Sequence, residues 1–146
     1  MIYWLDEEAW GAEGSFKSSF FRNDENSNEL NIYVINSELK ECAEKCAEAL
    51  NSLSRLEIKE ICEKLIENVK KETANEEVDL QGVNNPFEIL NYCWFITVYV
   101  DMASAEDETA YVVEGEGQWG TPVGFVIRNG KVIYAGGDYL DYIKNK

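Results

Sequence analysis

The sequence contains no histidine, only two prolines and few basic residues. Its 146 residues include 13 Lys plus Arg against 28 Asp plus Glu, which gives a net charge of −15. Without histidine the chain lacks the commonest general base and metal ligand, so the usual catalytic triads and zinc sites are excluded. The carboxylates would repel nucleic acid and anionic membranes, whereas a cationic partner would complement them. We therefore expect a protein that binds a basic partner, with no nucleic acid and no membrane as ligand.

Long apolar runs and paired cysteine motifs are also missing. No run of about 18 apolar residues occurs, and the first residues lack the basic and apolar regions of a secretory signal. None of the four cysteines lies in a CxxC pair, so the spacing predicts buried free thiols in a reducing compartment: Cys42, Cys46, Cys62 and Cys93. These features predict a cytoplasmic protein without a metal or a cofactor.

What the sequence does have is enough apolar material for one core. Apolar residues make up 45% of the chain and aromatic residues 12%. A chain of this length buries a sufficient core without disulfides or metals. No internal repeat or low-complexity linker divides it, so we expect a single domain over residues 1–146.

The periodicity of apolar residues predicts strands followed by helices and further strands. Alternation predicts strands over 16–21 and 30–35, joined by a long polar tip. Helical spacing predicts amphipathic helices over 39–53 and 58–69, the second opened by a Ser54 and Glu57 capping box. Asn85 followed by Pro86 predicts a short third helix through Asn91. Further strands are expected over 94–100 and 111–114.

The clearest local signal is a hairpin centred on Asn129-Gly130. This dipeptide stands between two apolar runs and is typical of a type I′ turn. A regular hairpin would pair Ile127 with Val132 and Phe125 with Tyr134. Together the elements predict an α+β fold, in which two or three helices pack on one face of an antiparallel sheet.

The run from Gly115 to Gly120 matches G-x-G-x-x-G. A dinucleotide site would need a helix to follow this loop, but Thr121-Pro122 and a predicted strand follow instead. We interpret the glycines as a bend between two strands.

The negative charge is most one-sided between residues 80 and 123. This segment has seven carboxylates and no Lys or Arg. The candidate partner-binding residues lie in it, namely Asp101, Glu106, Asp107, Glu108, Glu114, Glu116 and Trp119. Tryptophan is a frequent interface anchor, and an exposed one among carboxylates suits a basic protein.

The run from Val112 to Gly136 resembles the end of a group of small bacterial domains of unassigned function. Those domains have an acidic strand, a turn with a tryptophan, a hydrophobic strand, an Asn-Gly or Asp-Gly turn, and a last strand closing on glycine. Many of them are encoded as immunity proteins of contact-dependent or polymorphic toxin systems. Where they have Glu-His-Gly, this chain has Thr121-Pro122-Val123, so no role of that histidine carries over.

The resemblance implies an immunity protein that occludes the active site of a cognate toxin, which the charge suggests is basic and nuclease-like. Such a protein needs no catalytic residue, and we expect a monomer or a weak dimer. Two alternatives stay open. One is a small hydrolase that uses Glu114 and Glu116 as its carboxylates, and the other is an acidic adaptor or oligomeric regulator.

Overall fold

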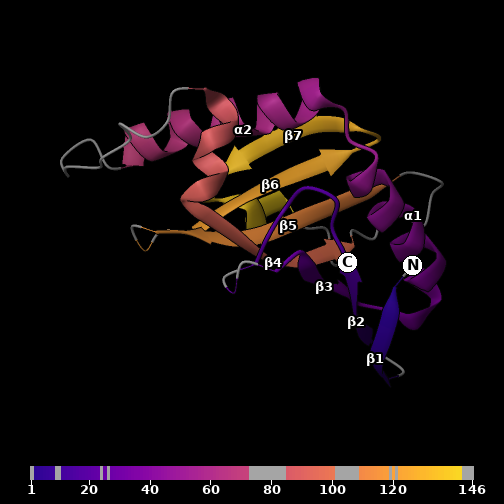
Figure 1. The fold of residues 1–146 in the computed structure, drawn as a ribbon. Helices are drawn as coiled ribbons and strands as arrows, with labels where there is room; N and C mark the ends of the chain where they lie inside the picture. Colours follow the sequence, from indigo (N-terminus) through magenta and orange to yellow (C-terminus); the bar gives the residue numbers. More distant parts are fainter. Residues whose placement is uncertain are drawn as a thin grey trace.

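A computed structural model describes residues 2–8, 11–23, 25, 27–72, 85–100, 109–118, 120 and 122–142. It is a mixed α/β structure built on one seven-stranded sheet, shown in Figure 1. The strands are β1 (Tyr3–Glu8), β2 (Gly11–Lys17), β3 (Glu29–Val34), β4 (Cys93–Val100), β5 (Ala110–Gly117), β6 (Pro122–Arg128) and β7 (Lys131–Gly136). The helices are α1 (Lys40–Asn51) and α2 (Arg55–Glu72), with short 3-10 helices η1 (Ser37–Leu39), η2 (Pro86–Asn91) and η4 (Tyr139–Tyr142).

The strands lie in the sheet in the order of the sequence. All neighbouring pairs are antiparallel except β3 and β4, which run parallel with Ile32 opposite Val98. The prediction of a wholly antiparallel sheet was therefore wrong at this pair. The chain between β3 and β4 includes α1, α2 and η2, and such a long crossover connection allows two adjacent strands to run in the same direction.

The first predicted hairpin is present, but its first strand begins at Gly11 and ends at Lys17, so the prediction of a strand over 16–21 was wrong for residues 18–21. β2 pairs with β3 from Ala12 opposite Val34 to Lys17 opposite Glu29. After β2 the chain turns at Ser18, whose buried hydroxyl accepts a hydrogen bond from the amide of Phe21 at 3.0 Å. The strand β1, which pairs with β2, was not predicted, because three consecutive acidic residues end it and hide the alternation.

The two α-helices follow the predicted apolar stripes. On α1 the buried residues are Ala43, Cys46, Ala47 and Leu50. The capping box before α2 is formed, since the amide of Ser54 donates to Glu57 at 2.9 Å and the amide of Glu57 donates to the Ser54 hydroxyl at 3.2 Å. The helix α1 contacts β3 and β4, whereas α2 contacts β6, β7 and η2. No helix among the described residues is long and apolar enough to cross a membrane.

The predicted third helix is the 3-10 helix η2, and Asn85 caps it by accepting a hydrogen bond from the amide of Phe87 at 3.1 Å. β5 is longer than predicted and runs through Gly115 and Gly117. At Gly115 a Cβ atom would collide with the backbone oxygen of Trp94, beside a bulge in β4. The glycines therefore permit close strand packing within β5, and only Gly120, with φ +84°, lies in the bend.

The hairpin at Asn129-Gly130 is formed, with φ of 53° and 77° at its two central residues. Ile127 pairs with Val132 as predicted, but the expected partnership of Phe125 with Tyr134 was wrong. A bulge shifts the register, so that Tyr134 lies opposite Val126 and Phe125 opposite Ala135. One extra residue in β7 moves Tyr134 to the other face of the sheet.

The buried side chains form two separate clusters. The main core joins helix residues to one set of alternate strand residues, including Val113, Phe125 and Ile127. The second cluster contains Val112, Val126 and Tyr139, with Tyr99 and Tyr134 packed against it. Because successive strand residues point to opposite faces, the second cluster lies on the sheet face opposite the main core. All four cysteines are thiols outside any disulfide, and Cys46, Cys62 and Cys93 are buried while Cys42 is partly buried.

Candidate functional site

Two of the predicted partner-binding residues lie on β5. Glu114 is partly buried and Glu116 is exposed, and both point to the same face as Val112 because they are two and four residues along the strand. The other five lie outside the described residues, namely Asp101, Glu106, Asp107, Glu108 and Trp119. The structure therefore brings Glu114 and Glu116 onto the sheet face of the second cluster.

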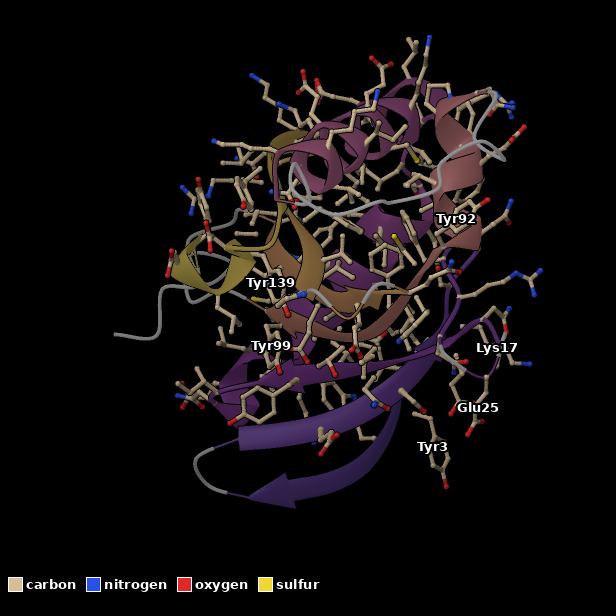
Figure 2. All side chains as sticks on the ribbon, turned by 90° about the vertical axis from the view of Figure 1, so that its left-hand side faces the viewer. Tyr3, Lys17, Glu25, Tyr92, Tyr99 and Tyr139 are labelled. Carbon is tan, nitrogen blue, oxygen red and sulfur yellow. The ribbon has the colours of Figure 1, made fainter. Side chains whose placement is uncertain are left out.

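Glu114 is held by tyrosine hydroxyls from two different elements. Tyr99 on β4 donates a hydrogen bond to Oε1 of Glu114 with an oxygen–oxygen distance of 3.3 Å. Tyr139 of η4 forms a second side-chain hydrogen bond to the same carboxylate. Figure 2 shows Tyr99 and Tyr139 close to each other. Two donors of this kind restrict the orientation of the carboxylate group.

Tyr139 reaches Glu114 because the strand residue beneath its ring, Gly124, has no side chain. Gly124 lies opposite Glu114 in the pairing of β5 with β6, and the Tyr139 ring occupies the space that a Cβ atom at Gly124 would need. Only 5% of Tyr139 is exposed. Gly124 thus leaves the space in which the Tyr139 ring of η4 packs.

The environment keeps both phenols protonated. Burial, followed by the charge of Glu114, raises the pKa of Tyr139 to about 12. The same two causes raise the pKa of Tyr99 above its ordinary value of 10.0. Loss of the phenol proton would place a second negative charge beside the carboxylate, so the hydroxyls remain hydrogen-bond donors at neutral pH.

Further tyrosines and one more carboxylate extend this arrangement. Tyr33 of β3 meets Tyr99 edge to face, with ring centres 6.1 Å apart, and Glu13 of β2 lies opposite Tyr33 in the strand pairing. The register bulge adds Tyr134, which packs against the second cluster. We define the tyrosine–glutamate face by these residues: Glu13, Tyr33, Tyr99, Glu114, Glu116, Tyr134 and Tyr139.

Basic residues on this side of the sheet lie toward the ends of the strands. Lys17 is four residues along β2 from Glu13, and Arg128 is four residues along β6 from Gly124. Among the described residues no Lys or Arg forms an ion pair with Glu114. The centre of the tyrosine–glutamate face is therefore negative.

Most of these residues were not predicted from the sequence. Tyr33 and Tyr99 alternate with Val34 and Val98, which are buried in the main core. A strict two-residue period therefore places both tyrosines on the sheet face opposite the main core, and this signal could have identified them. Glu13 was missed because β2 was predicted to begin at Phe16. Tyr139 carries no local signal, since only the folded chain brings it to Gly124.

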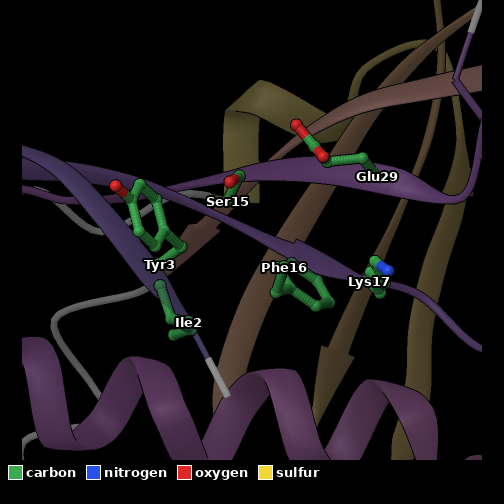
Figure 3. Close-up of a pocket in the computed structure, with 6 residues that line it drawn as sticks. All are labelled: Ile2, Tyr3, Ser15, Phe16, Lys17 and Glu29. Atoms are coloured by element: carbon green, nitrogen blue, oxygen red, sulfur yellow. The ribbon is translucent and has the colours of Figure 1, made fainter.

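Several hollows lie elsewhere on the surface. The one in Figure 3 has a volume of about 420 Å³ and lies near the edge strand β1, lined by Ile2, Tyr3, Ser15, Phe16, Lys17 and Glu29. Another of about 540 Å³ is lined by Arg55, Leu56, Lys59, Asn85, Pro86 and Phe87, and adjoins a smaller one at Phe20 and Phe95. A fourth lies between α2 and β7. None of these four hollows is lined by Glu114 or Glu116. Within the described ranges, no group of three or more acidic or cysteine side chains is placed to hold a metal ion.

Comparison with known proteins gives a family but no activity. Searches against curated proteins and against solved structures found no match. One family model matches residues 3–142, nearly the whole chain, and its description is a domain of unknown function, DUF6985. The chain therefore belongs to the DUF6985 family.

Proposed function

We propose that this domain is a cytoplasmic immunity protein, which binds a basic bacterial toxin and blocks the toxin's active site. The observation that carries the proposal is the tyrosine–glutamate face, where three carboxylates accompany four tyrosines on one side of the sheet, from β2 to β7 and η4. Tyrosine offers a large, rigid contact area at low entropic cost, and carboxylates complement a basic groove. The resemblance of residues 112–136 to immunity proteins supports the choice of a toxin as the partner.

The distribution of charge supports a basic partner in particular. The segment without Lys or Arg, residues 80–123, includes all of β4 and β5. These two strands contribute Tyr99, Glu114 and Glu116 to the face. With a net charge of −15, the whole chain would also attract a cationic partner from a distance and accelerate association at low salt.

The proposal takes α1 and α2 to cover the sheet face opposite the tyrosine–glutamate face, which leaves the latter for the partner. Binding by occlusion also needs no catalytic group. Glu114 already accepts two phenol hydrogen bonds, and Glu116 is exposed rather than enclosed in one of the four hollows. This arrangement favours recognition over carboxylate-dependent hydrolysis, which needs two carboxylates facing one enclosed substrate.

The proposal is tested with the protein encoded by the gene next to this one. The two proteins are co-expressed, and complex formation is measured by co-purification and calorimetry at about 50 mM and about 300 mM salt. We expect a complex that weakens as salt rises, and bacterial growth that depends on this chain when the neighbour is expressed. Absence of a complex at the lower salt, together with unchanged growth, would overturn the proposal.

A further inference from the structure

We propose that Glu114, between the hydroxyls of Tyr99 and Tyr139, is the receptor for the guanidinium group of an arginine side chain on the partner. This inference rests on the proposed function, because it names the chemical group that the tyrosine–glutamate face recognises. It adds a preference for arginine over lysine, which net charge alone does not predict.

The Glu114 carboxylate is fixed before a partner arrives. Tyr99 and Tyr139 both donate to it, and the ring of Tyr139 is wedged over Gly124. A side chain that is already ordered loses little rotamer freedom on binding, so more of the interaction energy appears as affinity. Each carboxylate oxygen has two lone pairs, so two phenol donors leave room for further hydrogen bonds.

No Lys or Arg among the residues that the structure describes balances the negative charge of Glu114. None of the described Lys or Arg residues forms an ion pair with Glu114, while Glu116 lies two residues along the same strand and Glu13 lies beyond Tyr33. Partial burial also limits the water that could solvate the carboxylate. An incoming cation therefore gains a strong attraction at this position.

The surroundings of Glu114 suit a planar cation. Tyr99, whose hydroxyl donates to the carboxylate, and Tyr33, which meets Tyr99 edge to face at 70° between ring planes, lie on the same sheet face as Glu114. A guanidinium is planar, stacks on such rings, forms paired hydrogen bonds with a carboxylate and is more weakly hydrated than an ammonium. A lysine would lose more hydration and form fewer directed contacts at the same place. The geometry thus favours arginine.

The test uses single side chains as probes on the full-length protein. The N-acetyl amides of arginine and of lysine are titrated, and the side-chain carboxyl and tyrosine ring resonances are followed by NMR. We expect saturable shifts of the Glu114, Tyr99 and Tyr139 resonances. The Kd for the arginine probe should be at least about threefold lower than the Kd for the lysine probe. The Glu114→Gln variant should lose these shifts, and Glu41→Gln on α1, an exposed carboxylate away from this face, should keep them.

The outcomes separate this inference from the proposed function. Equal Kd values for the two probes, or shifts confined to other residues, would overturn the arginine receptor. The proposed function would then survive if the complex with the neighbouring gene product still weakened with salt. Failure to form that complex would overturn the proposed function, and a selective response of Glu114 to arginine would still stand as a property of this site.

Discussion

Tyr99 on β4 and Glu114 on β5 are joined by a hydrogen bond of 3.3 Å from the phenol hydroxyl to the carboxylate. Their strands are neighbours, and Glu114 also receives a hydrogen bond from Tyr139. Three separate elements, β4, β5 and η4, therefore meet at one carboxylate. This contact ties the C-terminal end of the described chain to the centre of the sheet and orders the tyrosine–glutamate face.

Removal of the Tyr99 hydroxyl should weaken the fold measurably. The Tyr99→Phe substitution keeps the ring but deletes one hydrogen bond to a charged acceptor, so we expect the free energy of unfolding to fall by about 1 kcal/mol. Urea denaturation measures this change. Tyr33→Phe is the matched control, because the Tyr33 hydroxyl has no hydrogen-bond partner among the described residues. Equal losses in the two variants would contradict the assigned role of the hydrogen bond.

Removal of the Tyr111 hydroxyl in the main core, unlike removal of the Tyr99 hydroxyl, should not lower the free energy of unfolding. Its side chain is fully buried, and its hydroxyl has no hydrogen-bond partner among the described residues. A buried polar group without a partner costs free energy, so Tyr111→Phe should leave stability unchanged or raise it by up to about 1 kcal/mol. The same urea measurement applies. A loss of more than about 1 kcal/mol would mean that the hydroxyl is satisfied in the folded chain.

Gly124 should tolerate no side chain. A Cβ atom there would strike the Tyr139 ring and the backbone oxygen of Val113. We expect Gly124→Ala to lower the free energy of unfolding by about 1–3 kcal/mol, as for other overpacked sites. In a Tyr139→Ala background, Gly124→Ala should lower the free energy of unfolding by less than it does in the unmodified chain, since only the contact with Val113 remains. If Gly124→Ala lowered the free energy of unfolding equally in both backgrounds, the Tyr139 ring would not occupy the space above Gly124.

Stability should decrease in alkaline solution. Burial raises the pKa of the Cys62 and Cys93 thiols from 9.0 to about 12, and that of the Tyr139 phenol from 10.0 to about 12. The unfolded chain therefore releases these protons first as pH rises. The stability that the protonated groups contribute is complete below pH 9.0 and is lost progressively between pH 9.0 and about 12.

Chemical denaturation at a series of pH values measures this dependence. Each buried thiol should add a slope of up to about 1.4 kcal/mol per pH unit in this range. Cys62→Ala should reduce the slope, whereas the change Glu41→Gln on the exposed side of α1 should not. A stability that stays constant from pH 8 to pH 11 in the unmodified chain would contradict the assigned protonation states.

Features set by a few neighbouring residues could be predicted from the sequence. The turn at Asn129-Gly130 needs positive φ at both positions, and the Ser54 and Glu57 capping box needs only four residues. The same holds for the buried stripe on α1, because it follows the helical period.

Features set by distant parts of the chain could not be predicted in this way. The parallel pairing of β3 with β4 depends on where a long connection returns, and the position of Tyr139 depends on contact with Gly124, fifteen residues earlier. The bulge in β7 is one residue in size, yet it decides which face Tyr134 occupies. Glu114 and Glu116 could be named from the sequence as acidic, but the tyrosines that organise them required the folded sheet.

The central claim is that the tyrosine–glutamate face contacts a basic partner. Its most direct test is a calorimetric comparison of two triple variants with the neighbouring gene product at about 50 mM salt. One variant carries Glu13→Gln, Glu114→Gln and Glu116→Gln, and the other carries Glu41→Gln, Glu48→Gln and Glu67→Gln on exposed helix positions. Both remove three negative charges, so long-range attraction changes equally. We expect the first variant to raise the Kd by about tenfold or more and the second by less than about threefold. Equal weakening by the two variants would contradict the claim.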